Sequence, residues 1–223
     1  MDKVILCWSG GKDSAVTLYE IQRSKRYEVL SLLTVITEDY DRVSWHGVPR
    51  VLVEQQARSL GLPIQEVLIS KDCPNEEYES KMGETLTRFK QEGVSLVASG
   101  DIFLEDARKY REGNLAKLDM KGIFPVWGRD TAEVTRSFIN LGFQAIVVCV
   151  NSRVLDKGFV GRRLDEKFLA ELPPDVDPGG ENGEFHSFVF SGPMFKERID
   201  YTLGETVLRN SSYLCDLLPK GVG

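Results

Sequence analysis

Short apolar runs alternate with segments of helical periodicity through the first part of the chain. The apolar runs fall at residues 3–8, 29–36, 64–69, 94–101 and 122–127. Between them, apolar residues recur at helical spacing, as in residues 48–62 and 75–93, and Gly61 and Gly93 mark helix ends. Apolar strands separated by helices are typical of a parallel sheet that is covered on both faces. We therefore predict an α/β fold with a doubly wound, five-stranded parallel sheet.

The pattern changes after about residue 128. A predicted helix over 131–141 leads to an apolar strand over 143–151, then to glycine-rich loops and a partly alternating stretch. We expect a smaller α+β portion over residues 129–223, packed against a sheet domain over residues 1–128.

The composition is that of an ordinary globular protein, with 42% hydrophobic and 28% charged residues among 223. No apolar run approaches membrane-spanning length and no leader is visible, so we expect a cytoplasmic protein without a membrane partner. The net charge of −6, with basic clusters no larger than Arg162-Arg163, argues against an extensive nucleic-acid surface. The four cysteines form no CxxC pair, which disfavours a zinc site, and Cys7 and Cys149 are expected to be buried.

The most informative stretch is SGGKDS, residues 9–14, which joins the first predicted strand to the following helix. In open parallel sheets, ligands bind beyond the carboxyl ends of the strands. A helix N-terminus offers unpaired N–H groups and a positive dipole end to an anion. Gly10 and Gly11 let the backbone approach a phosphate, while Ser9 and Ser14 add hydroxyl donors. The stretch therefore predicts a phosphate site.

Lys12 and Asp13 complete this loop with opposite charges. Lys12 is a point charge suited to phosphate oxygens. Asp13 suits an anion cradle when a magnesium ion bridges it to the phosphates, so Asp13 is our candidate metal ligand. A capped strand–turn–helix junction without a ligand is the alternative. The loop matches neither GxxxxGK[ST] nor GxGxxG.

A second unusual segment is DPGGENGEFH, residues 177–186. Its glycines and proline predict a turn that precedes an alternating strand, and a period of two places Glu184 and His186 on one strand face, with Glu181 on the turn. Such a cluster can hold an ammonium, accept its proton or ligate a metal. A solvated surface turn is equally compatible with these residues.

Weaker candidates follow other predicted strands. His46 comes after the second strand, where an adenine or ribose would lie, although a lone histidine before a glycine is more often structural. Gly100 and Asp101 end the fourth strand, at the sheet edge where a phosphate or substrate would bind. Trp127 and Arg129 are candidates for the wall of the cleft between the two portions.

The SGGKDS loop after an initial strand resembles the pyrophosphatase loop of the N-type ATP pyrophosphatases, whose fold is adenine nucleotide alpha-hydrolase-like. GENGEF, residues 180–185, resembles the GE-x-GE-[FY] signature of the diphthine–ammonia ligase family. Residues 46–48, 98–108 and 158–169 are also similar to that family, so the resemblance covers nearly the whole chain. The loop and the signature together are specific, whereas either one alone is a moderate signal.

The resemblance implies an ATP-dependent ligase in which a substrate carboxylate attacks the α-phosphorus, releases pyrophosphate and is then attacked by ammonia. The residues expected to bind ATP and magnesium are Ser9, Gly10, Gly11, Lys12, Asp13, Ser14, His46, Gly100 and Asp101. Those expected to bind the acceptor and ammonia are Glu181, Asn182, Glu184 and His186. The expected catalytic residues are Lys12, Asp13, Glu184 and His186.

The acceptor is left open by the sequence. Family members that modify a histidine of elongation factor 2 resemble GEGGE[FY]E, whereas GENGEFH is similar to a bacterial-type subgroup. Protein-borne diphthine and a small carboxylate, such as a cobalamin-related one, are both alternatives, and free ammonia is the simplest nitrogen source. A homodimer is also left open. Two other classes are a tRNA-thiolating enzyme, which would need a cysteine pair and a basic surface, and a non-catalytic nucleotide-binding regulator.

Overall fold

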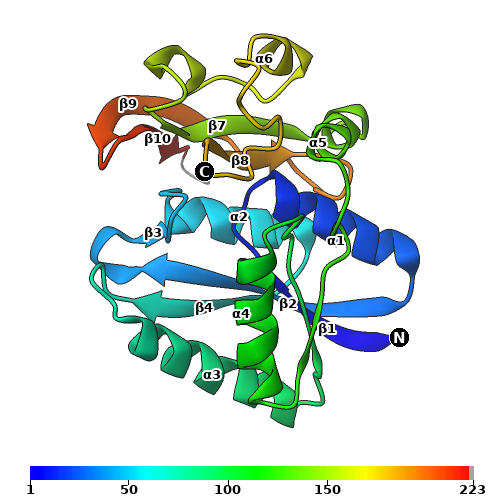
Figure 1. Cartoon of the computed structure of the whole chain (residues 1–223). Coiled ribbons are helices and arrows are strands. Elements are labelled where there is room, and N and C mark those ends of the chain that lie inside the picture. The colour runs from blue at the N-terminus through cyan, green and yellow to red at the C-terminus, as the bar shows by residue number, and fades with distance from the viewer. Residues whose placement is uncertain (221–223) are drawn as a thin grey trace.

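The structure, a computed structural model, describes residues 1–220 and contains two β-sheets with helices between and around them (Figure 1). The strands are β1 (Asp2–Cys7), β2 (Tyr27–Thr37), β3 (Arg42–Val43), β4 (Ile64–Ile69), β5 (Leu96–Ala98), β6 (Lys121–Ile123), β7 (Gln144–Asn151), β8 (Phe185–Ser191), β9 (Tyr201–Arg209) and β10 (Ser212–Pro219). The α-helices are α1 (Lys12–Ser24), α2 (Arg50–Leu60), α3 (Asn75–Gln91), α4 (Glu105–Ala116), α5 (Thr131–Asn140) and α6 (Glu166–Ala170). Two short 3-10 helices are η1 (Glu38–Tyr40) and η2 (Lys157–Phe159).

The larger sheet is built on five parallel strands in the order β4-β2-β1-β5-β6. The two-residue β3 adds to the end of β2 as an antiparallel strand. The chain runs outward from β1 to β2 and β4, and then crosses back to β5 and β6 on the other side. This order confirms the predicted doubly wound sheet. It also places the reversal of direction between β1 and β5, where open α/β sheets bind their ligands.

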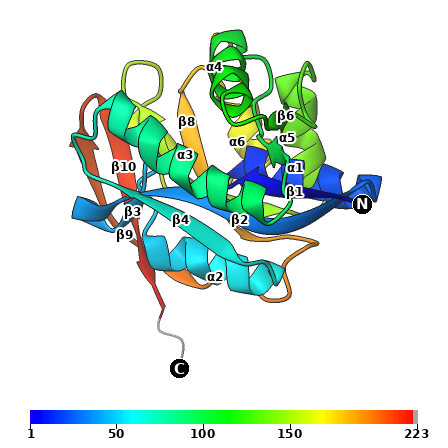
Figure 2. The same ribbon diagram turned by 90° about the horizontal axis from the view of Figure 1, so that it is seen from below.

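Helices cover both faces of the larger sheet, α1 and α2 on one face and α3 and α4 on the other (Figures 1 and 2). The apolar run of β1 explains how both faces are packed. Val4 and Leu6 belong to the hydrophobic cluster on the α1 side, whereas Ile5 packs in a second cluster with Leu86 of α3 and Leu115 of α4. Because side chains alternate along a strand, a strand buried on both faces has to be apolar throughout.

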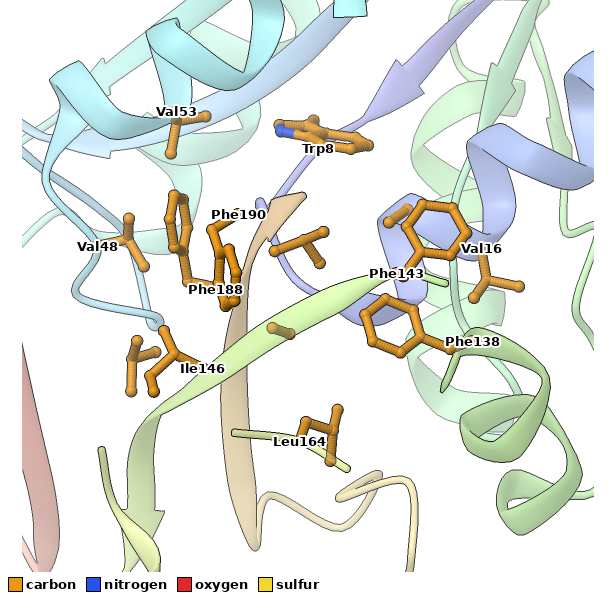
Figure 3. Packing of buried hydrophobic residues seen from close by; sticks show 14 of the residues in the cluster. Trp8, Val16, Val48, Val53, Phe138, Phe143, Ile146, Leu164, Phe188 and Phe190 are labelled. Carbon is orange, nitrogen blue, oxygen red and sulfur yellow. The ribbon is translucent and has the colours of Figure 1, made fainter. Parts of the chain in front are cut away.

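The smaller sheet is antiparallel, in the order β8-β7-β10-β9, and lies over α1 and α2 (Figure 1). Phe188 and Phe190 of β8 lie in the same cluster as Trp8 and Val53 of the larger domain (Figure 3). The predicted α+β portion is therefore present, with α5 and α6 beside its sheet. Since one cluster runs through both portions, the division at residues 128 and 129 stays a prediction.

Three local expectations are wrong. The fifth parallel strand ends at Ile123, and residues 124–127 form a turn in which the Trp127 N–H donates to the Phe124 carbonyl at 3.1 Å. Trp127 packs under the Arg108 guanidinium, 4.6 Å from the ring centroid, and does not line the main cleft. Arg129 is likewise outside the cleft and pairs with Glu20 at 3.2 Å.

No helix within residues 1–220 is long and apolar enough to cross a membrane.

Candidate active site

The SGGKDS loop turns the chain from the end of β1 into α1. Gly10 has a φ of +80°, in the left-handed region that favours glycine, and a Cβ there would lie 2.8 Å from Gln56 Oε1. Gly11 is the N-cap of α1, and a Cβ there would lie 3.1 Å from the Ser187 carbonyl oxygen. The two glycines are therefore required by the packing of the loop against α2 and β8, in addition to any approach of a phosphate.

A fully buried glutamine fixes the position of this loop. Gln56 on α2 accepts a hydrogen bond from Trp8 Nε1 at 2.8 Å and donates to the carbonyls of Gly10 and Val189, at 3.0 and 2.5 Å. The Val189 N–H also donates to the Gly10 carbonyl, at 2.8 Å. The side chain of Gln56 thus joins α2, the loop and β8 through three hydrogen bonds, and the loop is held between the two sheets.

Lys12 is the centre of charge in the site. Its side chain is only 2% exposed, and Nζ contacts Asp13 Oδ1 and lies 3.2 Å from Glu181 Oε1. Burial lowers the pKa of Lys12, but the two carboxylates outweigh it, so that the pKa is raised above its usual value. Burial and the charge of Asp13 raise the pKa of Glu181 to about 8, although Lys12 acts in the opposite direction. Lys12 therefore stays charged, with Asp13 as its firm partner, while Glu181 takes up a proton near neutral pH.

Two carboxylates, half-buried Asp177 and buried Glu184, brace the loop that carries Glu181. Asp177 Oδ2 accepts hydrogen bonds from the N–H groups of Gly179 and Glu181, both at 3.0 Å. The Glu184 carboxylate accepts from the Asn182 N–H at 2.9 Å, from the Asn182 side chain at 3.0 Å and from the Asp177 N–H at 3.2 Å. Charged acceptors of backbone N–H groups make strong hydrogen bonds. The loop is therefore rigidly built around these two side chains.

The expected pairing of Glu184 with His186 on one face of the strand is not observed. Glu184 directly precedes β8, is buried, and turns its carboxylate into the loop, whereas His186 lines the cleft. The backbone N–H groups of Asp177 and Asn182 need acceptors, and the Glu184 carboxylate supplies them. Glu184 is thus placed to position Glu181 and Asn182, and a direct catalytic role for it stays an untested prediction.

The two histidines of the chain meet in the cleft. The rings of His46 and His186 are 4.6 Å apart between centroids, with an angle of 49° between their planes. His46 was expected beside an adenine or ribose, but it lies against the segment that was expected to bind the acceptor. Burial lowers the pKa of both imidazoles, that of His186 to about 3. Both rings are therefore uncharged near neutral pH.

The end of β5 completes the site. A Cβ on Gly100 would lie 3.0 Å from the carbonyl carbon and oxygen of Asp13, so a glycine is needed for β5 to approach the first turn of α1. Asp101 Oδ2 lies 2.9 Å from Nε of Arg111 on α4. Both side chains line the cleft, and they form its second pair of opposite charges.

These elements enclose a cleft of about 720 Å³ at the carboxyl ends of the parallel strands. The predicted site residues that line it are Ser9, Gly11, Lys12, Asp13, Ser14, His46, Gly100, Asp101, Glu181, Asn182 and His186. Gly10 and Glu184 do not line it, because Gly10 faces Gln56 and Glu184 faces its own loop. Cys7, expected to be buried, is half-buried and borders the cleft. The fold thus brings together two motifs about 170 residues apart, although the roles of the individual residues stay predictions.

Two family models match the chain over nearly its whole length. The diphthamide synthase N-terminal domain matches residues 2–121, and the diphthamide synthase C-terminal domain matches residues 130–217. The chain belongs to the diphthamide synthase family. The resemblance seen in the sequence is thereby confirmed.

Three curated relatives illustrate how far this family extends. The diphthine–ammonia ligase of Danio rerio is 28% identical, over 93% of this chain and 89% of its own length. The Homo sapiens protein of the same name is 27% identical, over 91% and 84%. The Schizosaccharomyces pombe protein is 25% identical over 98% of this chain, which spans only 39% of that longer relative.

Two solved structures resemble this diphthamide synthase family member at low sequence identity. One is the tRNA thiolase NcsA of Methanococcus maripaludis with its [4Fe-4S] cluster, at 18% identity and a TM-score of 0.40, over 62% of this chain and 55% of that one. The other is a predicted subunit of tRNA methyltransferase from Methanocaldococcus jannaschii, at 16% identity and a TM-score of 0.41, over 97% and 98%. At these scores neither likeness bears on function.

Sequence reasoning missed several residues of the family member's site. Three of them form hydrogen bonds to the backbone of the two loops, namely Gln56, Ser187 and Asp177. Two others line the cleft, namely Trp45 and Arg111. Ser187 Oγ accepts a hydrogen bond from the Lys12 N–H at 3.2 Å, directly at the start of α1. Only Asp177 carried a visible signal, as the first residue of a glycine-rich turn. The other four belong to ordinary strand, helix and turn patterns.

The oxygen donors present fit a magnesium ion that is shared with phosphates. Within residues 1–220, no three His, Cys, Asp or Glu side chains form a ready metal site. Magnesium in phosphate sites uses one or two carboxylates together with phosphate oxygens and water. Asp13, which lines the cleft with a third of its side chain exposed, supplies one carboxylate of that kind.

The raised pKa of Glu181 predicts how stability depends on pH. Its folded value of about 8 lies above the ordinary 4.5, so between these values the folded protein binds more protons than the unfolded chain. The unfolding free energy should therefore fall as pH rises through this window. The comparison is made between pH 6.5 and 8, above the ordinary pKa of histidine, so that the histidines contribute little to the slope. In this range Glu181→Gln should make the unfolding free energy fall less steeply with pH.

Urea denaturation without added nucleotide measures this slope. The matched control is Glu205→Gln, at an exposed position on β9. We expect the control to keep the parent slope. If the Glu181 variant keeps it as well, Glu181 is not the group that titrates in this range.

Proposed function

We propose that the chain is an ATP-dependent ligase that joins ammonia to a carboxylate and releases AMP and pyrophosphate. Membership of the diphthamide synthase family and the name of the relatives, diphthine–ammonia ligase, support an amide ligase. The observation that carries the proposal is the contact between the two motifs, in which Lys12 of the phosphate loop meets Glu181 of the GENGEFH segment at 3.2 Å. A nucleotide on the loop would thus lie within reach of an acceptor on the other side.

The phosphates of ATP are placed at the N-terminus of α1. The first-turn N–H groups, the Ser9 and Ser14 hydroxyls and Lys12 supply donors for phosphate oxygens. Because Glu181 takes up a proton near neutral pH, its contact with Lys12 is the weaker of the two, and phosphate oxygens can replace it. A magnesium ion held by Asp13 would neutralise further charge on the phosphates.

The base is placed in the apolar side of the cleft, away from the loop. The residues that line this recess are Cys7 at the end of β1, Leu33 in the middle of β2 and Met82 of α3. Ligand sites are mostly apolar with few polar groups, which suits a purine ring. This proposal differs from the prediction from the sequence, which put an adenine or ribose beside His46.

The reaction proceeds in two steps. A carboxylate oxygen of the acceptor attacks the α-phosphorus, the bond between the α- and β-phosphates breaks, and pyrophosphate leaves with the bonding electrons. Lys12 and the first-turn N–H groups stabilise the charge that develops there. Ammonia then attacks the acyl carbon, the bond to AMP breaks, and the nitrogen gives up a proton.

The acceptor and ammonia are placed between the phosphate loop and the GENGEFH segment. Asn182, His186 and Glu181 line that side of the cleft. Above its pKa of about 8, ionised Glu181 can hold an ammonium and accept its proton, and the uncharged imidazole of His186 can accept or donate a hydrogen bond. Glu184 positions this group through the loop, as its hydrogen bonds to Asn182 and Asp177 indicate.

Turnover with a panel of carboxylates tests the proposal. The protein is incubated with ATP, magnesium and ammonium chloride, together with a peptide bearing diphthine or with small carboxylates, including a cobalamin-related one. Pyrophosphate, AMP and the mass of the acceptor are measured. Amide formation that is matched by pyrophosphate supports a ligase. Tight ATP binding without pyrophosphate for any acceptor favours a regulator instead.

The metal role of Asp13 gives a separate prediction. Asp13→Asn keeps the shape but removes the charge, so we expect at least about a tenfold rise in the magnesium concentration that half-saturates ATP binding. A fluorescent ATP analogue, titrated at stepped magnesium concentrations, measures this shift. Asp106→Asn, at an exposed position in the first turn of α4, is the control and should change nothing. An unchanged magnesium requirement in the Asp13 variant would remove Asp13 from the metal site.

A further inference from the structure

An ion pair after the end of β5 has hydrogen-bonding groups that the fold leaves unused. Nε of Arg111 on α4 lies 2.9 Å from Oδ2 of Asp101, but the angles between them are not those of a hydrogen bond. Both atoms are buried, and neither has a hydrogen-bond partner among residues 1–220. By contrast, Arg50 of α2 donates to both carboxylate oxygens of Glu66, at 2.9 and 2.5 Å. Buried polar groups are normally paired, so this exception points to a ligand.

The pair lies at the recess that we assign to the base of ATP. Arg111 lines the main cleft together with Cys7, Leu33 and Met82, the residues of that recess. The same four residues also line a deeper cavity of about 130 Å³, between helices α3 and α4 on one face of the sheet (Figure 2). Asp101 also lines the main cleft and follows β5, the parallel neighbour of β1, which ends at Cys7. Both charged residues are therefore placed at the wall of the recess.

The other charged residues of these cavities have partners elsewhere. Those of the main cleft contact one another at the phosphate loop, and they are Lys12, Asp13 and Glu181. Those of the deeper cavity are Glu79 and Lys117, whose charged groups are 3.4 Å apart. A third cavity of about 530 Å³, which Arg111 also lines, adds only Lys71. What faces the recess is therefore one carboxylate beside one guanidinium.

A neutral ligand suits this pair better than a phosphate does. An anion that approached Arg111 would also meet the Asp101 carboxylate, 2.9 Å from the guanidinium, and would be repelled by it. A carboxylate only accepts hydrogen bonds and a guanidinium only donates them. Together they fit a planar, uncharged group that has a donor next to an acceptor on one edge.

Adenine has such an edge. Its N6 amino group donates, and the ring nitrogen beside it, N7 on one edge and N1 on the other, accepts. Guanine has a carbonyl oxygen, O6, where adenine has the amino group. In the same orientation, this oxygen would face the Asp101 carboxylate without a hydrogen between them. Apolar recesses take their specificity from a few polar groups of this kind.

We propose that Asp101 and Arg111 select the base of the nucleotide. Asp101 accepts a hydrogen bond from the N6 amino group of adenine, and Arg111 donates one to the ring nitrogen beside it. The inference rests on the proposed function for the nucleotide and for the recess that holds its base, and it adds the residues that distinguish ATP from GTP. It also gives Asp101 a different role from the one expected from the sequence, which grouped it with the phosphate-binding residues.

Calorimetric titration with nucleotides and magnesium, without any acceptor, tests this assignment. The ligands are ATP, GTP, purine riboside triphosphate, which lacks the N6 amino group, and the 1-deaza and 7-deaza analogues of ATP, which each lack one ring nitrogen. We expect the parent protein to bind purine riboside triphosphate about tenfold more weakly than ATP, and GTP about 100-fold more weakly. One of the two deaza analogues should bind about tenfold more weakly than ATP, and the other should bind like ATP.

Two substitutions of Asp101 give opposite signatures. Asp101→Ala should bind ATP about tenfold more weakly than the parent does, and it should bind ATP and purine riboside triphosphate within about twofold of each other, because nothing is left to detect the amino group. Asp101→Asn offers an amide that can accept from N6 or donate to O6, so its preference for ATP over GTP should shrink to about tenfold or less. Arg111→Met should bind both deaza analogues like ATP, because the donor to the ring nitrogen is gone.

The matched controls are Asp106→Ala and Lys109→Met, which remove exposed charges of α4 outside the cleft. They should leave the affinities for all five nucleotides unchanged. Comparing nucleotides within one variant cancels any general effect of a substitution on folding, because such an effect weakens every nucleotide alike.

The outcomes separate this inference from the function itself. A parent protein that binds ATP and GTP equally, or an Asp101→Ala variant that loses all five nucleotides by the same factor, overturns the base assignment and leaves the ligase in place. In the second case the pair acts on the phosphates or on the loop. If the expected base preferences are found but no carboxylate supports pyrophosphate release, the base assignment stands and the ligase proposal falls. If no nucleotide binds, both fall together.

Discussion

Lys12→Met should reduce pyrophosphate release by about 10²–10³-fold while the protein stays folded. Methionine keeps most of the length of the buried side chain and removes the charge. In the proposed reaction Lys12 is the cation that faces the breaking phosphate bond, and its donors matter most where charge develops. KM for ATP should rise too, since the ammonium also binds phosphate oxygens before reaction.

The Lys12→Met variant should stay folded because Glu181 can take up a proton when its charged partner is removed. Removing one partner of a buried ion pair can cost about 3–5 kcal/mol, since a charge is left unpaired. Here the Glu181 pKa is already raised to about 8, and the loss of Lys12 raises it further, so Glu181 becomes neutral. A third of the Asp13 side chain is exposed to solvent, so its carboxylate is not left in a dry interior. We expect the loss of stability to lie below the usual range for a buried pair.

Pyrophosphate release and urea denaturation are measured on the same preparations. Lys109→Met is the control, because Lys109 is 70% exposed on α4 and, among the described residues 1–220, pairs only with Glu105. It should keep the parent rate. A Lys12→Met variant that is folded and turns over within about tenfold of the parent would contradict the assignment of Lys12 to the phosphates.

The parallel sheet and its loop were accessible from the sequence because their signals are local. Strand β4 was predicted at its observed bounds, 64–69, from its apolar run between Pro63 and the polar residues after it. The SGGKDS loop stands where β1 meets α1, so its place at the sheet edge followed from the strand order. Local patterns also gave the strand β8, whose apolar and aromatic residues are buried over most of its length.

Contacts between segments that are distant in the chain could not be predicted from the sequence. His46 meets His186 across 140 residues, and neither residue has a neighbour that indicates the other. Glu184 shows a further limit, since a period of two gives the face of a strand but not whether a loop turns a terminal side chain aside. Trp45 could not be recognised either, because positive φ in a bulky residue follows from the closure of the turn.

Gln56 shows why positioning residues are the hardest to find. It follows Gln55 on the same helix, and nothing in the sequence separates the two. The structure makes Gln55 half-buried and Gln56 fully buried. The partners of Gln56 are 46, 48 and 133 residues away, so only the assembled fold gives this side chain its role.

The second large effect is therefore expected from Gln56→Leu, which should lower kcat by about 100-fold. Leucine fills much of the same space but leaves the Trp8 indole N–H and the carbonyl of Val189 without their partner. The Gly10 carbonyl keeps the Val189 N–H as its donor. Each unpaired buried group costs about 1–3 kcal/mol, which the protein can reduce by shifting the loop away from α2. A small displacement of the loop moves Lys12 and the first-turn N–H groups out of line with the α-phosphorus.

Gln56→Glu separates the position of the loop from simple loss of stability. Glutamate keeps the acceptor for Trp8 but places an oxygen against the Gly10 and Val189 carbonyls, and in its protonated form its single O–H can donate to only one of them. We expect its activity to fall as pH rises, because ionisation of the introduced carboxyl group would repel both carbonyls. The Leu variant carries no such group and should keep the parent pH profile at a lower rate.

Gln55→Leu is the matched control for these variants, with the same substitution one residue earlier on α2. It should keep the parent kcat, and its change in unfolding free energy should stay within about 0.5 kcal/mol. The kinetics of the Gln56 variants are read together with the affinity for a fluorescent ATP analogue. A positioning role predicts that kcat falls more than ATP affinity, because a displaced loop still binds phosphates but aligns them poorly. If Gln56→Leu loses stability while the folded fraction keeps its kcat, Gln56 supports the core between the two sheets and does not set the position of the loop.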